Sequence, residues 1–280
     1  MYFKSSHNNM MHGVMFHHFH DKKNHIKIQG SISRDGLFKI IKYIGRENIL
    51  SPEDFIFYFK NNNHLKKVCF TFDDCLKSQI DIAIPLLEEF NIKSFFFIYT
   101  GIFEKKYNLF EVFRVFRNKA YKNLNIFYND FEIELLRNKK LNLEKIKKNK
   151  KKIFLETKKK FKFYSMEDIY HRYYRDEILD DKGYADIMIN LMKEKNFNLD
   201  VERKKILINE NDLKRLVKLN HTIGLHSHSH PTNIDKLSYK KQYDEYSRNK
   251  SFLEKIINKK IISVSYPNGK YNKDSKAIMK

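Results

Sequence analysis

The chain has 280 residues, of which 41% are hydrophobic and 15% aromatic, and its formal net charge is +21. This composition supplies a large core and excludes a globally disordered chain. Two cysteines, Cys69 and Cys75, exclude a disulfide-stapled secreted scaffold, and no segment approaches the roughly 18 apolar residues of a spanning helix. Because the first residues also lack the apolar core of a signal peptide, we expect a soluble, cytoplasmic protein.

The excess of basic residues has two interpretations. Lys, Asn, Ile, Phe and Tyr are abundant while Gly and Pro are scarce, a bias that an AT-rich coding sequence alone would produce. No zinc-finger spacing, aromatic RNA-binding signature or glycine-rich phosphate loop accompanies the lysines, so no nucleic-acid partner is expected. The charge is then mostly solvated surface, with attraction of a phosphate-bearing substrate or an anionic membrane surface as the alternative.

Strand and helix signals alternate over residues 1–103. In chain order they predict a strand over 13–16 followed by histidines, helices that begin after Ser33 and Ser51, a strand over 67–74, a helix over 80–90 and a strand over 92–100. This alternation predicts an α/β layered or barrel fold.

Residues 104–200 differ in character and predict a lysine- and aromatic-rich helical insertion. Aromatic residues recur at helical spacing, and Ser165 with Asp168 predicts a further helix start. The aromatic stripe consists of Phe103, Tyr107, Phe110, Phe113 and Phe116. It is core or a self-association surface, and the second option leaves a homo-oligomer open.

The alternating pattern resumes over residues 201–280. A helix that begins after Asn209, a strand over 221–225, a helix over 239–257 and a strand over 261–266 are predicted. We therefore expect residues 1–103 and 201–280 to form the two parts of one α/β fold, interrupted by the insertion.

Two clusters at strand ends carry metal chemistry. Asp73 and Asp74 leave an apolar strand together, and a bound cation would relieve the repulsion between them. His226 and His230 are four residues apart, which points both imidazoles the same way. One carboxylate and two imidazoles leave positions open for water and substrate, and they suit Zn²⁺ as well as Co²⁺, Mn²⁺, Fe²⁺ or Ni²⁺. The alternative is two unrelated surface features.

Three segments in this order resemble the first three motifs of the polysaccharide deacetylases (NodB-homology, carbohydrate esterase family 4). They are Thr71–Asp74, His226–His230 and Ser265–Gly269, and Val14–Phe19 is similar to the strand start of many members. The resemblance implies a deformed (β/α) barrel of NodB type, with its site at the carboxyl ends of the strands. A barrel that is incomplete at the C-terminus is the alternative.

The same resemblance assigns roles to individual residues. It implies Asp73 as the catalytic base and Asp74, His226 and His230 as ligands of a divalent metal, with Zn²⁺ as first choice. The residues that would bind substrate are His18, His228, Tyr266, Pro267 and Asn268. Ser265 stands where many members have an arginine.

The resemblance also implies two further motifs, the last with a histidine as general acid, whereas the eleven residues after Gly269 contain no histidine. Either the chain is a truncated product, or another group donates the proton, and His17, ahead of His18 and His20, is the candidate for this catalytic role.

The expected function is metal-dependent hydrolysis of a non-peptide C–N bond in carbohydrate metabolism: an N-acyl group, N-acetyl first, leaves a saccharide or glycoconjugate. Asp73 acts as base and a metal-bound water as nucleophile. The alternative is a catalytically inactive glycan-binding or assembly module.

Overall fold

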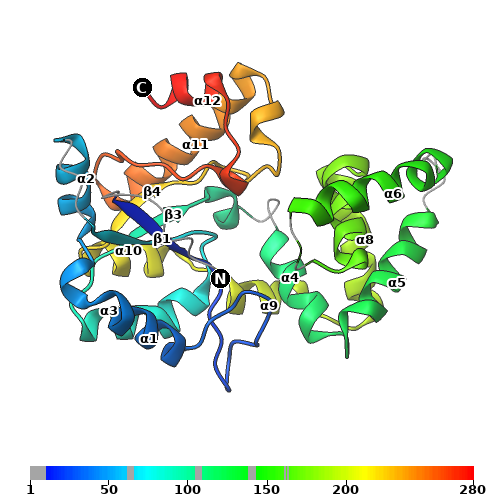
Figure 1. Cartoon of the computed structure of the whole chain (residues 1–280), viewed down its shortest axis with the longest axis horizontal. Helices are drawn as coiled ribbons and strands as arrows, with labels where there is room; N and C mark the ends of the chain where they lie inside the picture. Colours follow the sequence, from blue (N-terminus) through cyan, green and yellow to red (C-terminus); the bar gives the residue numbers. More distant parts are fainter. Residues whose placement is uncertain (1–10, 62–65, 105–108, 138–142, 161, 163) are drawn as a thin grey trace. The chain divides into compact units, whose positions relative to one another are not determined.

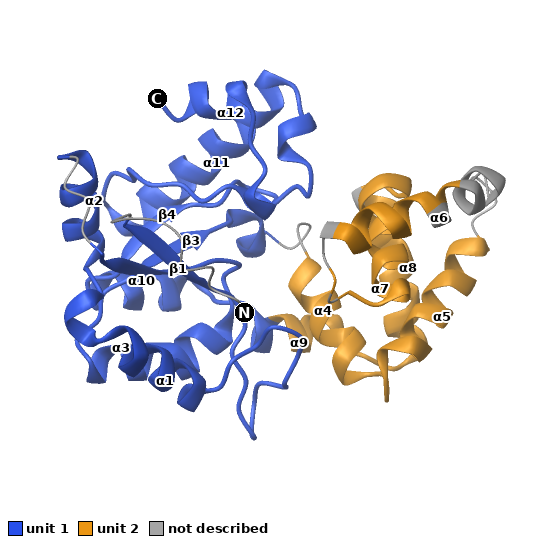
Figure 2. Ribbon diagram, in the orientation of Figure 1, with its two compact units in different colours: residues 1–108, 204–280 blue, residues 109–203 orange. Residues whose placement is uncertain are grey.

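The computed structural model describes residues 11–61, 66–104, 109–137, 143–160, 162 and 164–280. Figure 2 shows that the chain divides into two compact units, Met1–Asn108 with Lys204–Lys280, and Leu109–Arg203. The first unit contains all the residues to which the sequence assigns chemistry.

A parallel four-stranded sheet forms the centre of the first unit (Figure 1). In sheet order its strands are β1 (His12–Phe16), β2 (Val68–Phe72), β3 (Phe95–Ile98) and β4 (Thr222–Leu225). Every residue of β3 is buried, which is typical of a parallel strand covered on both faces. Because neighbouring strands all run parallel, their carboxyl ends meet at one edge of the sheet. The predicted α/β fold class is confirmed.

Six helices among the described residues belong to this unit. They are α1 (Arg34–Ile44), α2 (Pro52–Lys60), α3 (Ile84–Glu89), which follows a π-helical turn, α10 (Glu210–Lys218), α11 (Tyr239–Ile257) and α12 (Lys273–Ile278). The predicted caps are present: Ser33 accepts from the Gly36 N–H and Ser51 from the Asp54 N–H. These hydrogen bonds satisfy donors that have no partner within the helix, so local sequence fixes where these helices begin.

The strand predicted over 261–266 is wrong in extent. The structure has a single bridge there, between Leu225 and Val264. Two hydrogen bonds make the contact, from the Leu225 N–H to the Ser263 carbonyl and from the Ser265 N–H to the Leu225 carbonyl, both 2.9 Å long. With pairing to one short neighbour only, this segment makes too few ladder bonds to form a regular strand.

The second unit is helical, as the composition of residues 104–200 predicts. Its helices are α4 (Phe110–Lys119), α5 (Leu124–Leu136), α6 (Leu143–Lys160), α7 (Met166–Tyr173) and α8 (Asp181–Glu194), and α9 (Leu199–Ile206) leads back to the first unit. Ser165 caps α7 as expected. None of the helices in the described parts of the chain is long and apolar enough to cross a membrane.

The predicted aromatic stripe divides between the two units. Phe113 and Phe116 lie in the core of the helical unit, which favours the core interpretation over a surface. Phe103 instead belongs to the first unit, where it stacks on Phe252 of α11 with ring centroids 5.1 Å apart. Tyr107 lies outside the described residues. The homo-oligomer stays a prediction.

His221, directly before β4, couples the stability of the sheet to pH. Its ring is buried against Phe96, and its Nδ1 accepts the Ser94 N–H at 3.2 Å, which requires the neutral form. Burial, together with the charge of Lys93, lowers the pKa of His221 to about 4, although Glu88 acts in the opposite direction. The folded protein therefore disfavours a proton that the unfolded chain accepts near its ordinary pKa of about 6.5.

This histidine is expected to contribute stability that is complete above about pH 6.5 and lost as the pH falls toward 4. The pKa difference corresponds to up to about 3 kcal/mol. Urea denaturation across this window, in wild type and His221→Asn, checks it, because asparagine retains an acceptor but does not titrate. Equal losses of stability in the two proteins would contradict the assignment.

Candidate active site

Asp73 and Asp74 lie where β2 ends at the carboxyl edge of the sheet. The Asp73 N–H donates to the Phe16 carbonyl of β1 at 3.2 Å, which continues the sheet pairing by one residue. The chain then turns sharply, because Asp74 and Cys75 both have left-handed backbone, with φ of 72° and 55°. Left-handed conformations are costly for residues other than glycine and cluster at functional sites. The turn directs two adjacent carboxylates into the unit.

The segment His226–His230, called the histidine loop below, follows β4 at the same edge of the sheet. Ser227 and His230 have φ values of 64° and 53°, so this loop also contains left-handed backbone. The Ser227 hydroxyl oxygen accepts the His230 N–H at 3.0 Å and closes the turn. The turn brings the rings of His226 and His230 to a centroid distance of 4.8 Å.

The three predicted metal ligands converge. Oδ1 of Asp74 lies 3.6 Å from Nε2 of His226 and 3.3 Å from Nε2 of His230. One ligand atom from each of the three residues lies within 4.8 Å of the others. Asp74 and His226 are buried and His230 is partly buried, so the cluster is shielded from bulk water. Residues separated by about 150 positions thus form a possible metal site.

The hydrogen bonding of His226 fits a metal ion. Its Nδ1 lies 2.8 Å from the Ser265 carbonyl oxygen, which can only accept, so Nδ1 carries the proton. With its proton on Nδ1, the neutral ring would offer its Nε2 lone pair to a metal ion held together with Asp74 and His230. A metal-binding histidine is commonly held in this way, by donation from its other nitrogen to a carbonyl. The donor set of one carboxylate and two imidazoles fits a divalent transition metal.

The surroundings of the two aspartates shift their pKa values in opposite directions. Burial by itself raises the pKa of Asp74, but hydrogen bonding to His226 and His230 lowers that pKa well below its usual range. Burial raises the pKa of Asp73 above its ordinary value, and the charge of Asp74 acts in the same direction against the effect of His226. Asp74 is thus ionised, as a metal ligand would need to be, whereas Asp73 holds a proton more readily, as a base must.

Asp73 keeps one oxygen available. Its Oδ2 accepts the Ser265 hydroxyl at 2.9 Å and lies 3.9 Å from Nε2 of His226. Its Oδ1 is buried and has no hydrogen-bond partner among the described residues. An acceptor buried without a partner is costly unless a ligand or water meets it. This oxygen is where a proton can be taken up.

Among the three histidines that follow β1, the structure places His17 at the cluster. Its Nε2 is 3.7 Å from Oδ2 of Asp74, and its side chain is 36% exposed. His20 instead contacts Ser31, with its Nδ1 2.9 Å from the Ser31 hydroxyl. His18 is only 6% exposed, and its substrate-binding role stays a prediction.

His228, a predicted substrate-binding residue, is held by side chains of the segment that follows β3, and its role stays a prediction. Its side chain is buried, with Nδ1 2.8 Å from the Thr100 hydroxyl and Nε2 3.5 Å from Glu104. The reason is the alternation of the loop: His226 and His230 turn toward Asp74, and the residue between them turns toward the segment that follows β3. His228 therefore links the histidine loop to the segment that follows β3.

The third motif lies directly after the bridge to β4. Tyr266 packs on Tyr271 with centroids 5.0 Å apart, and Pro267 is buried in a short 3₁₀ turn. Asn268 is exposed, has a φ of 55° and donates to the Thr232 carbonyl at 3.4 Å. The substrate-binding roles of these three residues stay predictions.

Helix α11 holds the histidine loop with two residues that the sequence analysis missed. Asn249 accepts the His226 N–H at 3.0 Å and donates to the Ile98 carbonyl of β3 at 2.9 Å. Glu245, one turn earlier, accepts the N–H groups of His228 and Ser229 at 2.9 and 2.7 Å. Their spacing of four residues places both side chains on one face of the helix. The sequence does not show that this face is buried, and without that knowledge two polar residues do not indicate a role.

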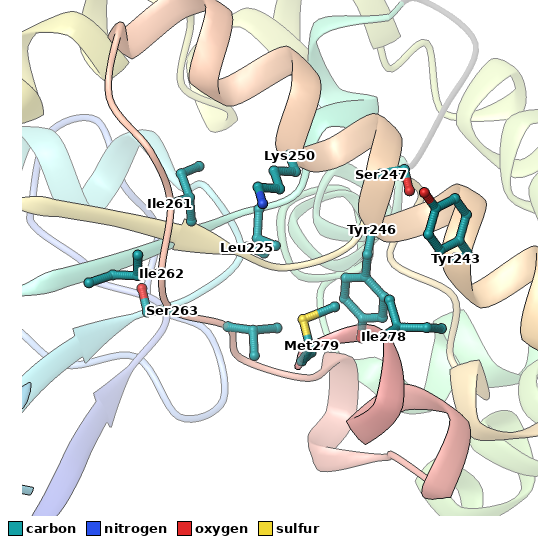
Figure 3. Close-up of a pocket in the computed structure, with 11 residues that line it drawn as sticks. Leu225, Tyr243, Tyr246, Ser247, Lys250, Ile261, Ile262, Ser263, Ile278 and Met279 are labelled. Atoms are coloured by element: carbon teal, nitrogen blue, oxygen red, sulfur yellow. The ribbon is translucent and has the colours of Figure 1, made fainter. Parts of the chain in front are cut away.

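A cavity of about 250 Å³ lies elsewhere in the same unit, between α11, α12 and the segment after α11 (Figure 3). Leu225, Tyr246, Ile261 and Met279 are among the residues that line it. None of the predicted site residues is in its lining. The cavity is therefore separate from the candidate active site.

Comparisons with known proteins agree with the motifs. A sequence model of the family described as polysaccharide deacetylase matches residues 183–280, which include the histidine loop and the third motif. The match does not reach Asp73 and Asp74, which the fold brings to that loop. A search of curated proteins found no match.

Solved deacetylase structures share the fold. The PplD deacetylase of Streptococcus pyogenes, solved with acetate, is 16% identical with a TM-score of 0.54 over 96% of this chain and 78% of its own. IcaB of Ammonifex degensii is 13% identical with a TM-score of 0.55 over 97% and 80%. A de-N-acetylase of Aggregatibacter actinomycetemcomitans is 11% identical with a TM-score of 0.52 over 96% and 83%. Residues 183–280 thus resemble the polysaccharide deacetylases in sequence, and the chain shares the fold of these solved deacetylase structures, as its motifs indicate.

Proposed function

We propose that this protein is a metal-dependent hydrolase that removes an N-acyl group, N-acetyl first, from a saccharide or glycoconjugate. The observation that carries the proposal is the convergence of Asp74, His226 and His230 beside Asp73, whose buried Oδ1 has no partner among the described residues. Three ligands with open positions, next to a carboxylate that can take up a proton, are the parts that amide hydrolysis requires.

Asp74, His226 and His230 would hold the ion, with Zn²⁺ as first choice. A bound divalent metal lowers the pKa of water and polarises the acyl carbonyl. Oδ1 of Asp73 takes the proton of the attacking water, while Oδ2 stays bonded to Ser265. Backbone N–H groups near Asn268 would then stabilise the developing oxyanion.

His17 is the proposed donor of the proton that the leaving amine requires. It is half-buried beside the cluster, with Nε2 3.7 Å from Asp74, so it can reach both substrate and water. An imidazole can both donate and accept a proton, and histidine is the side chain used most often in general acid catalysis.

The substrate class follows from the family and the charge of the chain. Polysaccharide deacetylase resemblance points to an N-acetylated saccharide. A net charge of +21 would favour substrates that bear phosphate, or an anionic membrane surface nearby. The cytoplasmic location stays a prediction.

The test is release of acetate from N-acetylated oligosaccharides by protein loaded with Zn²⁺ or Co²⁺. Asp73→Asn is expected to lower kcat by about 10²- to 10⁴-fold, the usual contribution of a general base, with metal content unchanged. Retention of one equivalent of metal by the wild type without acetate release from a broad amide panel would support a non-catalytic module instead.

A further inference from the structure

We infer that Ser265 is a positioning residue that holds the catalytic base and one metal ligand at the same time. The inference rests on the proposed function, in which Asp73 is the base and His226 a ligand. By the resemblance, Ser265 stands where many members of the family have an arginine. A serine in this role is therefore a feature of this chain.

Two hydrogen bonds of Ser265 carry the inference. Its hydroxyl donates to Oδ2 of Asp73 at 2.9 Å. Its backbone carbonyl accepts from Nδ1 of His226 at 2.8 Å. The first bond fixes which carboxylate oxygen stays free, and the second fixes the ring tautomer that offers Nε2. One residue thus orients both the base and a ligand.

The position of Ser265 is itself fixed by the sheet. Its N–H donates to the Leu225 carbonyl, and the Leu225 N–H donates to the Ser263 carbonyl, both at 2.9 Å. Leu225 is the last residue of β4 and directly precedes His226. The bridge therefore sets the register between the serine and the histidine that it holds, and a shift of one residue would break both contacts.

Serine differs from arginine in charge. A hydroxyl supplies one hydrogen bond to Asp73 without adding a positive charge beside the two imidazoles. Arginine would add a permanent charge next to the metal ligands and a longer side chain. Ser265 therefore contributes geometry and no charge. Removal of its hydroxyl should affect turnover more than substrate binding.

The experiment compares Ser265→Ala with Ser263→Ala, a matched control two residues earlier. The Ser263 hydroxyl is buried without a hydrogen-bond partner among the described residues. We expect Ser265→Ala to lower kcat by about 10- to 100-fold, with KM nearly unchanged and metal still bound, because its carbonyl remains for His226. Ser265→Thr, which retains the hydroxyl, should recover most of the loss. Wild-type turnover in Ser265→Ala would overturn the inference.

A second measurement does not need activity. In a double-mutant cycle of Ser265→Ala and Asp73→Ala, the shifts in the urea midpoint should be clearly non-additive, whereas the cycle of Ser263→Ala with Asp73→Ala should be additive. Additive shifts in both cycles would overturn the inference even if Asp73→Asn abolished turnover. Non-additive shifts in a protein without turnover would support the contact while the proposed function failed.

Discussion

Asp74→Asn is expected to abolish tight binding of a divalent metal and to reduce deacetylation to background. Oδ1 of Asp74 is the atom that both imidazole Nε2 atoms approach, at 3.6 and 3.3 Å. Asparagine retains the shape but removes the only negative charge among the three ligands. Loss of a residue that merely supports a ligand costs about 10- to 100-fold in metal affinity, so loss of a charged ligand should exceed about 100-fold. Metal analysis after gel filtration, with titration calorimetry, measures this.

The matched control is Asp81→Asn. Asp81 is also an aspartate in contact with a histidine, since its Oδ2 lies 2.9 Å from Nε2 of His25, but it is 38% exposed and outside the cluster. This variant should retain one equivalent of metal and normal turnover. The assignment of the metal site fails if Asp74→Asn binds metal as tightly as Asp81→Asn.

The convergence of Asp74 with His226 and His230 could be predicted from the sequence because each group directly follows an apolar strand. In a parallel sheet, groups that follow different strands reach the same edge even when about 150 residues separate them. The helix starts at Ser33, Ser51 and Asn209 could be predicted for a different reason. Caps are local hydrogen bonds, so neighbouring residues alone decide them.

The supporting contacts could not be predicted, because they depend on register between distant segments. Whether Ser265 meets Asp73 is decided by the single bridge at Val264, and the sequence over 261–266 is equally consistent with a longer strand. Glu245 and Asn249 are ordinary polar residues of a helix until its packing is known. The contact of His228 with Thr100 could not be predicted either, because the three histidines of the loop have the same chemistry and only the loop conformation separates them.

Gly224→Ala is expected to destabilise the sheet. A Cβ at this position would lie 2.5 Å from Cδ1 and Cε1 of Phe97 and 2.7 Å from the Ser263 hydroxyl oxygen. Phe97 pairs with Gly224 across the sheet and stacks on Phe95, 5.6 Å away, in a buried cluster, so its ring has little room to move. Overpacking of this kind costs about 1–3 kcal/mol or more. Urea denaturation should show the loss.

Because Gly224 lies two residues before His226, the same change should also weaken metal binding by displacing the end of β4. Gly13→Ala on β1 is the control, since the nearest atom to its Cβ would be the Thr71 methyl carbon, at 3.2 Å, and not a ring at 2.5 Å. Phe97→Leu combined with Gly224→Ala should lose less stability than the two single changes added together, because a smaller side chain makes room for the new methyl group. Strict additivity, or equal losses in Gly13→Ala and Gly224→Ala, would show that contact with Phe97 does not explain why a glycine stands two residues before the metal ligand.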